Sequence, residues 1–353
     1  MSDAGALVDS HGRRLRDLRI SVTDRCNFRC LYCLPETEAA QHFYRGHWAG
    51  AADPAPIDHP WLPRAHLLTF EEIERTVRIA AGLGIQKVRV TGGEPLLRRQ
   101  VEQLVARLAR IPGLEDLALT TNGFLFRSKA QALRDAGLKR VSFSLDSLDP
   151  ENFRKITGRD GLAEVLAAIR LAQDLGLNPV KVNAVIIRGL NDHELEALAE
   201  FGHAHGLHLR FIEFMPLDSA RAWSRDLVVT GREMLQRLEA RYALQPVPSD
   251  SQAETARRWR FARGGPGEIG LIAPVSEPFC GHCNRLRLTA DGHVRTCLFS
   301  VVEHDLRSHL RSGETDAAVG AWLRGVAWNK EARHRIGEPD FVAPSRSMSC
   351  IGG

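Results

Sequence analysis

The stretch that decides the fold is LRISVTDRCNFRCLYC, residues 18–33. Its first part, residues 18–22, is a short apolar run that predicts a strand. Three cysteines, Cys26, Cys30 and Cys33, follow at once, so their thiols converge in one loop at the carboxyl end of that strand. Clustered cysteines of this kind indicate a metal site.

Short apolar runs alternate with helix-period segments from residue 15 to about residue 213, the pattern of β/α units around a parallel sheet. We expect six strands, at residues 18–22, 87–90, 116–119, 140–143, 180–187 and 207–211. The five helices expected between them cover residues 70–81, 99–109, 128–136, 162–175 and 193–205. The predicted fold class is therefore α/β, a partial (β/α)6 barrel of the TIM type.

The pattern changes after residue 213, and we expect a domain boundary near residue 220. Residues 1–220 would form the partial barrel, with residues 38–68 as a long loop inserted in the first β/α connection because they lack either periodicity. Residues 221–353 carry a second cysteine cluster and helical patterns at 231–240 and 315–328. This part is expected to be a C-terminal α+β domain.

The bulk composition excludes several classes of protein. The 353 residues are 44% hydrophobic, and a net charge of +4 is too small for a surface dedicated to nucleic acid. No apolar run reaches the length of a signal peptide or a membrane span, so we expect a cytoplasmic protein with no membrane partner. Seven cysteines in such a compartment indicate metal ligands rather than disulfides.

The first cysteine cluster suits a 4Fe-4S cluster. Three thiolates can hold three of its irons and leave the fourth without a protein ligand, open to a small molecule. The alternative is a zinc site completed by a histidine, although zinc ligands usually come as separated pairs.

Polar motifs follow several of the other predicted strands. They are TGGEP at 91–95, TTNG at 120–123, SLDS at 144–147 and Met215-Pro216. The paired glycines allow the backbone to approach a ligand closely. Because the carboxyl ends of barrel strands build the active site, these motifs together predict one pocket.

A second cysteine cluster, Cys280, Cys283 and Cys297, again supplies three thiols rather than four. His282 and His293 are possible fourth ligands. Zinc ribbons use a similar spacing, so a zinc site stays an alternative here.

Arginines accompany this second cluster. Arg285 and Arg287 lie two residues apart on a predicted strand, so both side chains point to the same face. Arg19 and Arg89 occupy comparable positions on the predicted barrel strands. Guanidinium groups suit bidentate binding of phosphate, so inward-facing arginines here indicate an anionic ligand.

The first cysteine loop resembles the hallmark of the radical S-adenosylmethionine superfamily, and TGGEP resembles that family's GGEP motif. The wider sequence is similar to one family over nearly the whole chain, the GTP 3′,8-cyclases, also called molybdenum cofactor biosynthesis protein A. The matching stretches are LRISVTDRCNFRCLYC, VRVTGGEPLL, TTNG, SFSLDS, KVNAV, FCGHCNRLRLTADG and the terminal Ile351-Gly352-Gly353.

This resemblance implies two 4Fe-4S clusters, S-adenosylmethionine as cofactor and GTP as substrate. The cluster ligands would be Cys26, Cys30, Cys33, Cys280, Cys283 and Cys297. The S-adenosylmethionine site would be lined by Tyr32, Gly93, Ser144 and Met215. The GTP contacts would be Arg19, Arg89, Thr120, Lys181, Arg285 and Arg287. The residues with a catalytic role would be Arg285, Arg287, Gly352 and Gly353.

The reaction implied is the conversion of GTP to (8S)-3′,8-cyclo-7,8-dihydroguanosine 5′-triphosphate, the first step of molybdenum cofactor biosynthesis. A 5′-deoxyadenosyl radical would take hydrogen from ribose C3′, and C3′ would then attack guanine C8. The family further implies a homodimer and transfer of the product to cyclic pyranopterin monophosphate synthase.

Two other functions stay open at this point: a peptide-modifying radical enzyme, and a non-enzymatic iron-sulfur or zinc module. The first has no need of a Gly-Gly tail or of paired arginines, and the second leaves the strand-end motifs unexplained. The chain departs from the family pattern at Leu34, in the long segment 38–68 and at Cys350, which we expect to be a free thiol.

Overall fold

The computed structural model describes residues 5–34, 36–45, 61–217 and 223–352. Six strands follow one another in the first two thirds of the chain, each where the sequence predicts it. They are β1 (Asp17–Ser21), β2 (Lys87–Thr91), β3 (Asp116–Thr121), β4 (Arg140–Ser144), β5 (Lys181–Ile186) and β6 (His208–Glu213). All neighbours in this series pair in parallel, so the predicted α/β class is confirmed.

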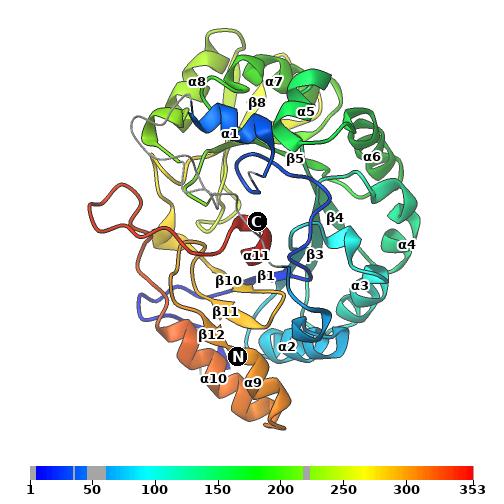
Figure 1. The fold of residues 1–353 in the computed structure, drawn as a ribbon, viewed down its shortest axis with the longest axis vertical. Helices are drawn as coiled ribbons and strands as arrows, with labels where there is room; N and C mark the ends of the chain where they lie inside the picture. The colour runs from blue at the N-terminus through cyan, green and yellow to red at the C-terminus, as the bar shows by residue number, and fades with distance from the viewer. Residues whose placement is uncertain (1–4, 35, 46–60, 218–222, 353) are drawn as a thin grey trace.

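The helices of this part form the outer layer around the strands (Figure 1). They are α2 (Phe70–Gly82), α3 (Val101–Ala109), α4 (Ala130–Asp135), α5 (Pro150–Thr157), α6 (Leu162–Asp174) and α7 (Leu195–Ala204). Each turns an apolar face inward, and leucine, isoleucine and valine side chains from strands and helices form one continuous core. The sequence predicted five of these helices and missed α5.

The remaining strands extend the same sheet at both edges. They are β7 (Leu244–Val247), β8 (Arg257–Phe261), β9 (Glu268–Ile272), β10 (Arg285–Leu288), β11 (His293–Arg295) and β12 (His304–Asp305). Strand β10 pairs in parallel with β1, and β9 pairs in parallel with β6. The order is β12-β11-β10-β1-β2-β3-β4-β5-β6-β9-β8-β7, so the sheet is a barrel that does not close.

The strands of the C-terminal part, expected to be an α+β domain, continue the sheet of the N-terminal part. Strands β1 and β6 would otherwise expose rows of unpaired backbone groups, and β10 and β9 supply the missing partners. The boundary near residue 220 stays a prediction, because strands from both sides of it belong to one sheet.

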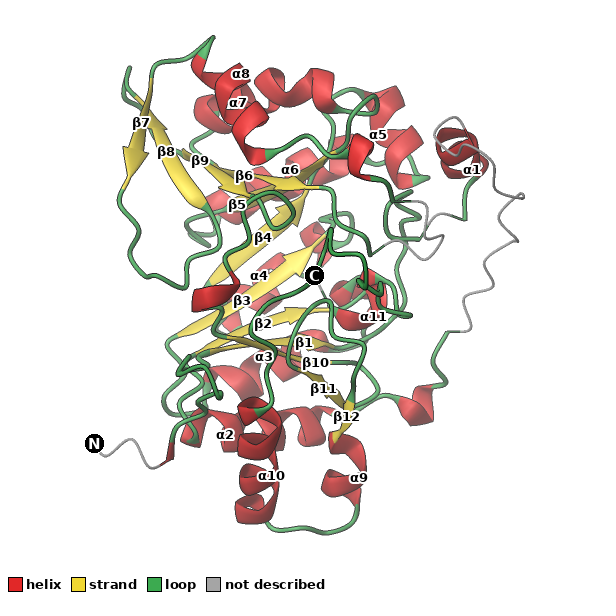
Figure 2. Ribbon diagram, turned by 90° about the vertical axis from the view of Figure 1, so that its left-hand side faces the viewer, coloured by secondary structure: helices red, strands yellow, loops and turns green. Residues whose placement is uncertain are grey.

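The last elements of the fold are helices. Helix α8 (Gly231–Glu239) lies near the expected position, and α9 (Leu306–Arg311) and α10 (Asp316–Trp328) pack at the outer edge below β12 (Figure 1). A short helix, α11 (Met348–Ile351), ends the chain at the side to which the parallel strands point (Figure 2). None of the described helices is long and apolar enough to cross a membrane.

The sequence predicts a loop over residues 38–68, but the segment is not a loop throughout. Helix α1 (Glu38–Arg45) begins it, and a turn of 3-10 helix (Arg64–His66) lies near its end. The Leu62 backbone N–H donates to Asp24 Oδ2 at 2.6 Å, which ties this segment to the loop before the first cysteines. Residues 46–60 lie outside the described part of the chain.

Candidate active site

Both cysteine clusters open into one cavity of about 290 Å³ at the carboxyl ends of the parallel strands. Its lining includes all six predicted cluster cysteines, which come from segments about 250 residues apart in the sequence. Each cluster contributes three thiols. The cavity therefore unites two sites that the sequence could only describe separately.

The first cysteine loop is held by backbone hydrogen bonds on its outer side. The Arg29 N–H donates to Thr157 O at 2.8 Å and the Leu31 N–H to Ile156 O at 3.0 Å, so the end of α5 supports the loop. Phe28 packs edge-on against Phe124 and Phe153, with ring centroids 6.0 and 5.9 Å apart. These aromatic rings separate the loop from solvent on this side.

Burial raises the pKa of the Cys26 thiol to about 11, and it raises the pKa of Cys30 and Cys33 as well. Isolated thiolates are therefore disfavoured here, whereas thiolates bound to a metal cluster are not. Three half-buried thiols that line one cavity from a single loop fit a 4Fe-4S cluster with one open iron.

The glycines of TGGEP approach the cysteine loop itself, and not only the cavity. A Cβ on Gly92 would lie 2.4 Å from Thr23 O, and one on Gly93 would lie 2.4 Å from Arg25 O. The Gly93 N–H donates to Thr23 O at 2.8 Å. Two glycines are needed because the end of β2 packs directly on the backbone that leads into Cys26.

Glu94 joins the ends of β2 and β3. Its carboxylate is fully buried and accepts from Thr121 Oγ1 at 2.8 Å, from the Asn122 N–H at 2.7 Å and from the Leu96 N–H at 3.0 Å. Burial raises its pKa to about 7 against the effect of these hydrogen bonds. The Asn122 amide nitrogen in turn lies 3.9 Å from Cys26 Sγ.

A second carboxylate, Asp146, orients Tyr32. The Tyr32 hydroxyl donates to Asp146 Oδ2 at 2.6 Å, and the Val185 N–H donates to Oδ1 at 2.8 Å. Burial raises the pKa of Asp146 to about 6. All four residues predicted to contact S-adenosylmethionine line the cavity: Tyr32, Gly93, Ser144 and Met215.

The second set of cysteines flanks the β10–β11 hairpin: Cys280 and Cys283 come before β10, and Cys297 follows β11. Burial opposes ionisation of the Cys283 thiol, but the cations of Arg285 and Lys330 and hydrogen bonds from Arg285 outweigh it and lower the pKa to about 6. Arg13 donates to Cys280 O at 2.7 Å and fixes the start of this loop. A thiol that ionises readily, in a loop with two further cysteines, fits a metal cluster.

The two histidines considered as fourth ligands do not line the cavity, within the described residues. His293 Nδ1 lies 3.3 Å from Asp291 Oδ2 instead. Within the described residues, neither His282 nor His293 therefore faces the cavity that the three thiols line.

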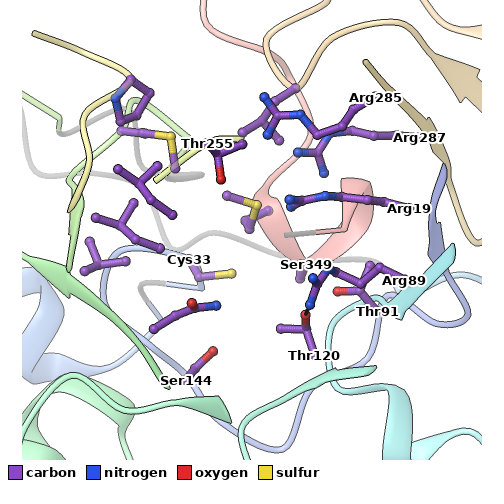
Figure 3. A pocket seen from close by; sticks show the side chains of 18 of the residues that line it. Arg19, Cys33, Arg89, Thr91, Thr120, Ser144, Thr255, Arg285, Arg287 and Ser349 are labelled. Atoms are coloured by element: carbon purple, nitrogen blue, oxygen red, sulfur yellow. Dashed lines mark hydrogen bonds between the residues drawn. The ribbon is translucent and has the colours of Figure 1, made fainter. Parts of the chain in front are cut away.

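Arg287, Arg19 and Arg89 stand in one row across β10, β1 and β2, because Arg19 is the register partner of both other residues. Figure 3 shows these three arginines and Arg285 along one wall of the cavity, across from Cys33 and Ser144. Among the described residues, none of the four forms an ion pair with a carboxylate. Such a row of half-buried and buried cations that face one cavity is suited to a polyanion.

Arg89 and Arg19 differ in their hydrogen bonds. Arg89 donates to Thr120 Oγ1 at 3.1 Å and to Ser142 Oγ at 3.0 Å. Arg19 Nε is buried without a hydrogen-bond partner in the described structure. Burial, followed by the charges of Arg287 and Arg285, lowers the pKa of Arg19 well below its ordinary value.

Lys181 is the one predicted GTP contact within the described residues that does not line this cavity. It lies in a second cavity of about 210 Å³ with Arg140 and His208, and Arg210 lines both cavities. Burial and the charge of Arg210 lower the pKa of Lys181 to about 6. Its contact with substrate stays a prediction.

The C-terminal segment reaches the wall of the main cavity through Met348 and Ser349. Arg287 Nη1 donates to the Gly352 carbonyl, and Ser349 is part of the cavity lining. Gly352 has a φ of 74°, and a Cβ there would lie 2.5 Å from Ser21 Oγ. Only glycine fits this position; Gly353, the other predicted tail residue, lies outside the described part of the chain.

Several cavity residues were not predicted from the sequence. They are Asn183, Arg210, Thr255 and His334, whereas Asn122 and Asp146 belong to the TTNG and SLDS motifs from which the pocket was predicted. A signal existed for Asn183 and Arg210, since alternate residues of β5 and β6 share the inward face. No comparable pattern marks Thr255 or His334, which lie in irregular segments.

Comparison with known proteins identifies the family. Residues 20–202 match the Radical SAM superfamily, and residues 207–336 match Molybdenum Cofactor Synthesis C. A GTP 3′,8-cyclase from Streptomyces coelicolor is 44% identical over 352 residues, which is 99% of this chain and 97% of the relative. The chain belongs to the GTP 3′,8-cyclase family. A GTP 3′,8-cyclase from Rhodopirellula baltica is 45% identical, covering 100% of this chain and 94% of the relative.

Solved structures share the fold with this GTP 3′,8-cyclase family member. Streptococcus suis SuiB bound to S-adenosylmethionine superposes with a TM-score of 0.59 at 14% identity, covering 89% of this chain and 69% of SuiB. At this identity the likeness shows the fold alone. The full-length sequence match to GTP 3′,8-cyclases therefore decides between the functions left open, and sets aside the peptide-modifying enzyme and the non-enzymatic module.

Proposed function

We propose that this chain is a radical S-adenosylmethionine lyase that converts GTP to (8S)-3′,8-cyclo-7,8-dihydroguanosine 5′-triphosphate, the first step of molybdenum cofactor biosynthesis. One observation carries the proposal: two cysteine trios share a single cavity with a row of arginines that form no ion pair with a carboxylate among the described residues. A cofactor site alone would not require the arginines, and an anion site alone would not require the cysteines.

Cys26, Cys30 and Cys33 would hold the first 4Fe-4S cluster, and Cys280, Cys283 and Cys297 the second. When bound, the first cluster and S-adenosylmethionine supply the 5′-deoxyadenosyl radical. Tyr32, Gly93, Ser144 and Met215 line the side of the cavity that would bind this cofactor. The Tyr32–Asp146 hydrogen bond of 2.6 Å keeps the tyrosine in a fixed orientation there.

The substrate would lie along the arginine wall. Arg285 and Arg287, next to the second cysteine trio, would hold one end of GTP, and Arg19, Arg89 and Thr120 would continue the contacts. The cations then extend through Arg210 toward Lys181, which gives the triphosphate a path between the two cavities. These cations would neutralise the substrate charge, and among the described residues Arg19, Arg89 and Arg287 form no ion pair with a carboxylate that would compete with it.

The residues of the chain would act mainly by positioning. Ribose C3′ must stay close to both the radical source and guanine C8, and water must be excluded during the reaction. Arg287 is held by the Gly352 carbonyl, so its orientation is set before substrate arrives. Arg285, Arg287 and the Gly352-Gly353 tail are the groups to which we assign catalytic roles.

We further propose a homodimer in the cytoplasm that passes its product to cyclic pyranopterin monophosphate synthase. Resemblance to the GTP 3′,8-cyclase family supports these assignments. Sedimentation of the anaerobic holoenzyme tests the dimer: a single species at the monomer mass would contradict it.

The decisive experiment is an anaerobic assay of the reconstituted enzyme. The protein is loaded with iron and sulfide and incubated with S-adenosylmethionine and reductant, with and without GTP, and 5′-deoxyadenosine is measured by chromatography. We expect formation that depends strongly on GTP and is lost in Cys26→Ala. Arg78→Ala is the matched control, since Arg78 lies on the outer helix α2, pairs with Asp316 far from both trios, and should retain activity. Cleavage indifferent to GTP would contradict the proposed substrate.

A further inference from the structure

The segment 346–352, of which Met348 and Ser349 line the cavity, begins with an ion pair of good geometry. Arg346 donates to both oxygens of Asp291, Nη1 to Oδ1 and Nη2 to Oδ2, each at 2.9 Å. Arg346 Nη2 also lies 2.9 Å from Glu303 Oε2. Asp291 is only 5% exposed, so the pair is largely shielded from solvent. Bidentate contacts of this kind combine strength with a defined orientation.

The two carboxylates are themselves held in place. Thr289 Oγ1 donates to Asp291 Oδ1 at 2.6 Å. Arg295, which is 2% exposed, pairs with Glu303 at 2.5 Å and donates to the Ser300 carbonyl. The acceptors for Arg346 are therefore oriented by buried side chains rather than by the tail.

Both ends of the tail contact one hairpin. Asp291 lies in the turn between β10 and β11, and Arg287, which donates to the Gly352 carbonyl, lies on β10. Between these contacts the segment is compact: the Cys350 N–H donates to Ser347 O at 3.1 Å and the Gly352 N–H to Met348 O at 3.0 Å. A shift at the first contact would therefore be transmitted to Gly352.

We propose that Arg346, together with Asp291 and Glu303, is a positioning latch that holds the tail so that Gly352 meets Arg287. Arg346 is a positioning residue and not a catalytic one, because it acts through Gly352. The claim that the latch matters for turnover rests on the proposed function of the tail. The claim that the latch holds the tail in place does not rest on that function, so the two claims can be tested separately.

The first test measures hydrogen–deuterium exchange in the full chain. In Arg346→Ala we expect the backbone amides of residues 348–352 to exchange about tenfold or more faster than in the wild type, because hydrogen bonds to charged groups are among the strongest local constraints. Arg335→Ala is the matched control, because Arg335 also forms ion pairs in the C-terminal part of the chain, with Glu338 and Asp340, but these lie before the segment 346–352. It should leave exchange in the tail unchanged.

A second test separates the latch from a general loss of folding. Arg346→Lys keeps the charge but loses the bidentate contact. We expect the amides of residues 348–352 to exchange at a rate between those of the wild type and Arg346→Ala. Because Asp291 and Arg346 form one pair, Asp291→Asn should add little to the effect of Arg346→Ala. Additive effects, or exchange in Arg346→Lys identical to the wild type, would overturn the latch.

The third readout is GTP-dependent formation of 5′-deoxyadenosine by the loaded enzyme. We expect Arg346→Ala to lower the rate at saturating GTP about tenfold or more, with iron content unchanged, since small displacements in an active site are costly. A fast-exchanging tail with full activity would refute the role in turnover. If the wild type itself shows no response to GTP, the proposed function fails while the exchange data still decide the latch.

Discussion

Arg19 of β1 and Arg287 of β10 are direct register partners across two parallel strands. The charge of Arg287 adds to burial in lowering the pKa of Arg19, so the two guanidinium groups repel each other in the ligand-free cavity. An anion placed between them would relieve this repulsion. The row of arginines therefore lowers the stability of the ligand-free protein while it supplies the charge that binds an anion.

Replacing Arg19 with methionine tests this opposition. Removing a buried charge without an ionic partner should stabilise the ligand-free protein by about 1 kcal/mol or more. The same change should weaken GTP binding about thirtyfold or more, as expected when one partner of a buried charge pair is lost. Thermal unfolding with and without GTP measures both effects. Arg16→Met, at an exposed position just before β1, should change neither, and a destabilised Arg19→Met protein would speak against the argument.

Lys181 should take up a proton when GTP binds. Its pKa is lowered to about 6 in the free protein, mainly by burial and by Arg210, so the amine is neutral at pH 8. A triphosphate beside it favours the ammonium form and raises that pKa, so binding between pH 6 and its ordinary value of 10.5 consumes about one proton. Calorimetry in buffers of different ionisation enthalpy reports this uptake. Lys181→Met should abolish it, and a wild type without uptake would exclude Lys181 from the substrate site.

Glu94 is expected to stabilise the junction of β2 and β3. In Glu94→Gln an amide N–H₂ must face at least one of the three donors, which should cost about 1 to 3 kcal/mol in the free energy of unfolding. Urea unfolding of the cluster-free protein measures this loss. Glu115→Gln, at an exposed site where Gln86 donates at 2.7 Å, should cost less than about 0.5 kcal/mol.

The same carboxylate predicts a dependence on pH. Its pKa in the folded protein is raised from 4.5 to about 7, so its stabilising contribution is complete below pH 4.5 and is lost as the pH rises through 7. The wild type should therefore lose stability relative to Glu94→Gln between these values. If the free energy of unfolding of the wild type instead rose with pH relative to that of Glu94→Gln, the raised pKa of Glu94 would be contradicted.

Gly352→Ala should displace the tail although only a methyl group is added. The residue has a φ of 74°, and the new Cβ would lie 2.5 Å from Ser21 Oγ and 2.8 Å from Thr91 Cγ2. We expect GTP-dependent formation of 5′-deoxyadenosine to fall about a hundredfold, with iron content unchanged. Gly325→Ala, in α10 with open space around it, should keep full activity and stabilise the helix slightly. Equal activity in both variants would show that Gly352 is not constrained in the working enzyme.

Local signals were enough for most of the secondary structure. Predicted strand 18–22 corresponds to β1 (Asp17–Ser21), and each later barrel strand lies within a few residues of its predicted place. Helix α5 was missed although its start is marked by Asp149, whose side chain accepts from the Asn152 N–H at 2.7 Å, and by Pro150. That signal was present, and the short length of the helix hid it.

The position of Lys181 shows a different limit. Lys181 and Asn183 share one face of β5, yet only Asn183 lines the main cavity. Their depth along the strand separates them, and a pattern of alternation carries no information on depth.

The sequence by itself determined the chemistry of this protein: two sets of three cysteines, four arginines at strand positions and a terminal glycine pair, because spacing along one strand or loop fixes which side chains point together. The tertiary structure alone decided that these groups meet in one cavity. Strand β10 pairs with β1 across more than 260 residues, which aligns Arg287 with Arg19, and the tail returns to Arg287 through Arg346. The register of β10 on β1 and the path of the tail back to Arg287 depend on contacts between distant segments, which no local pattern of residues encodes.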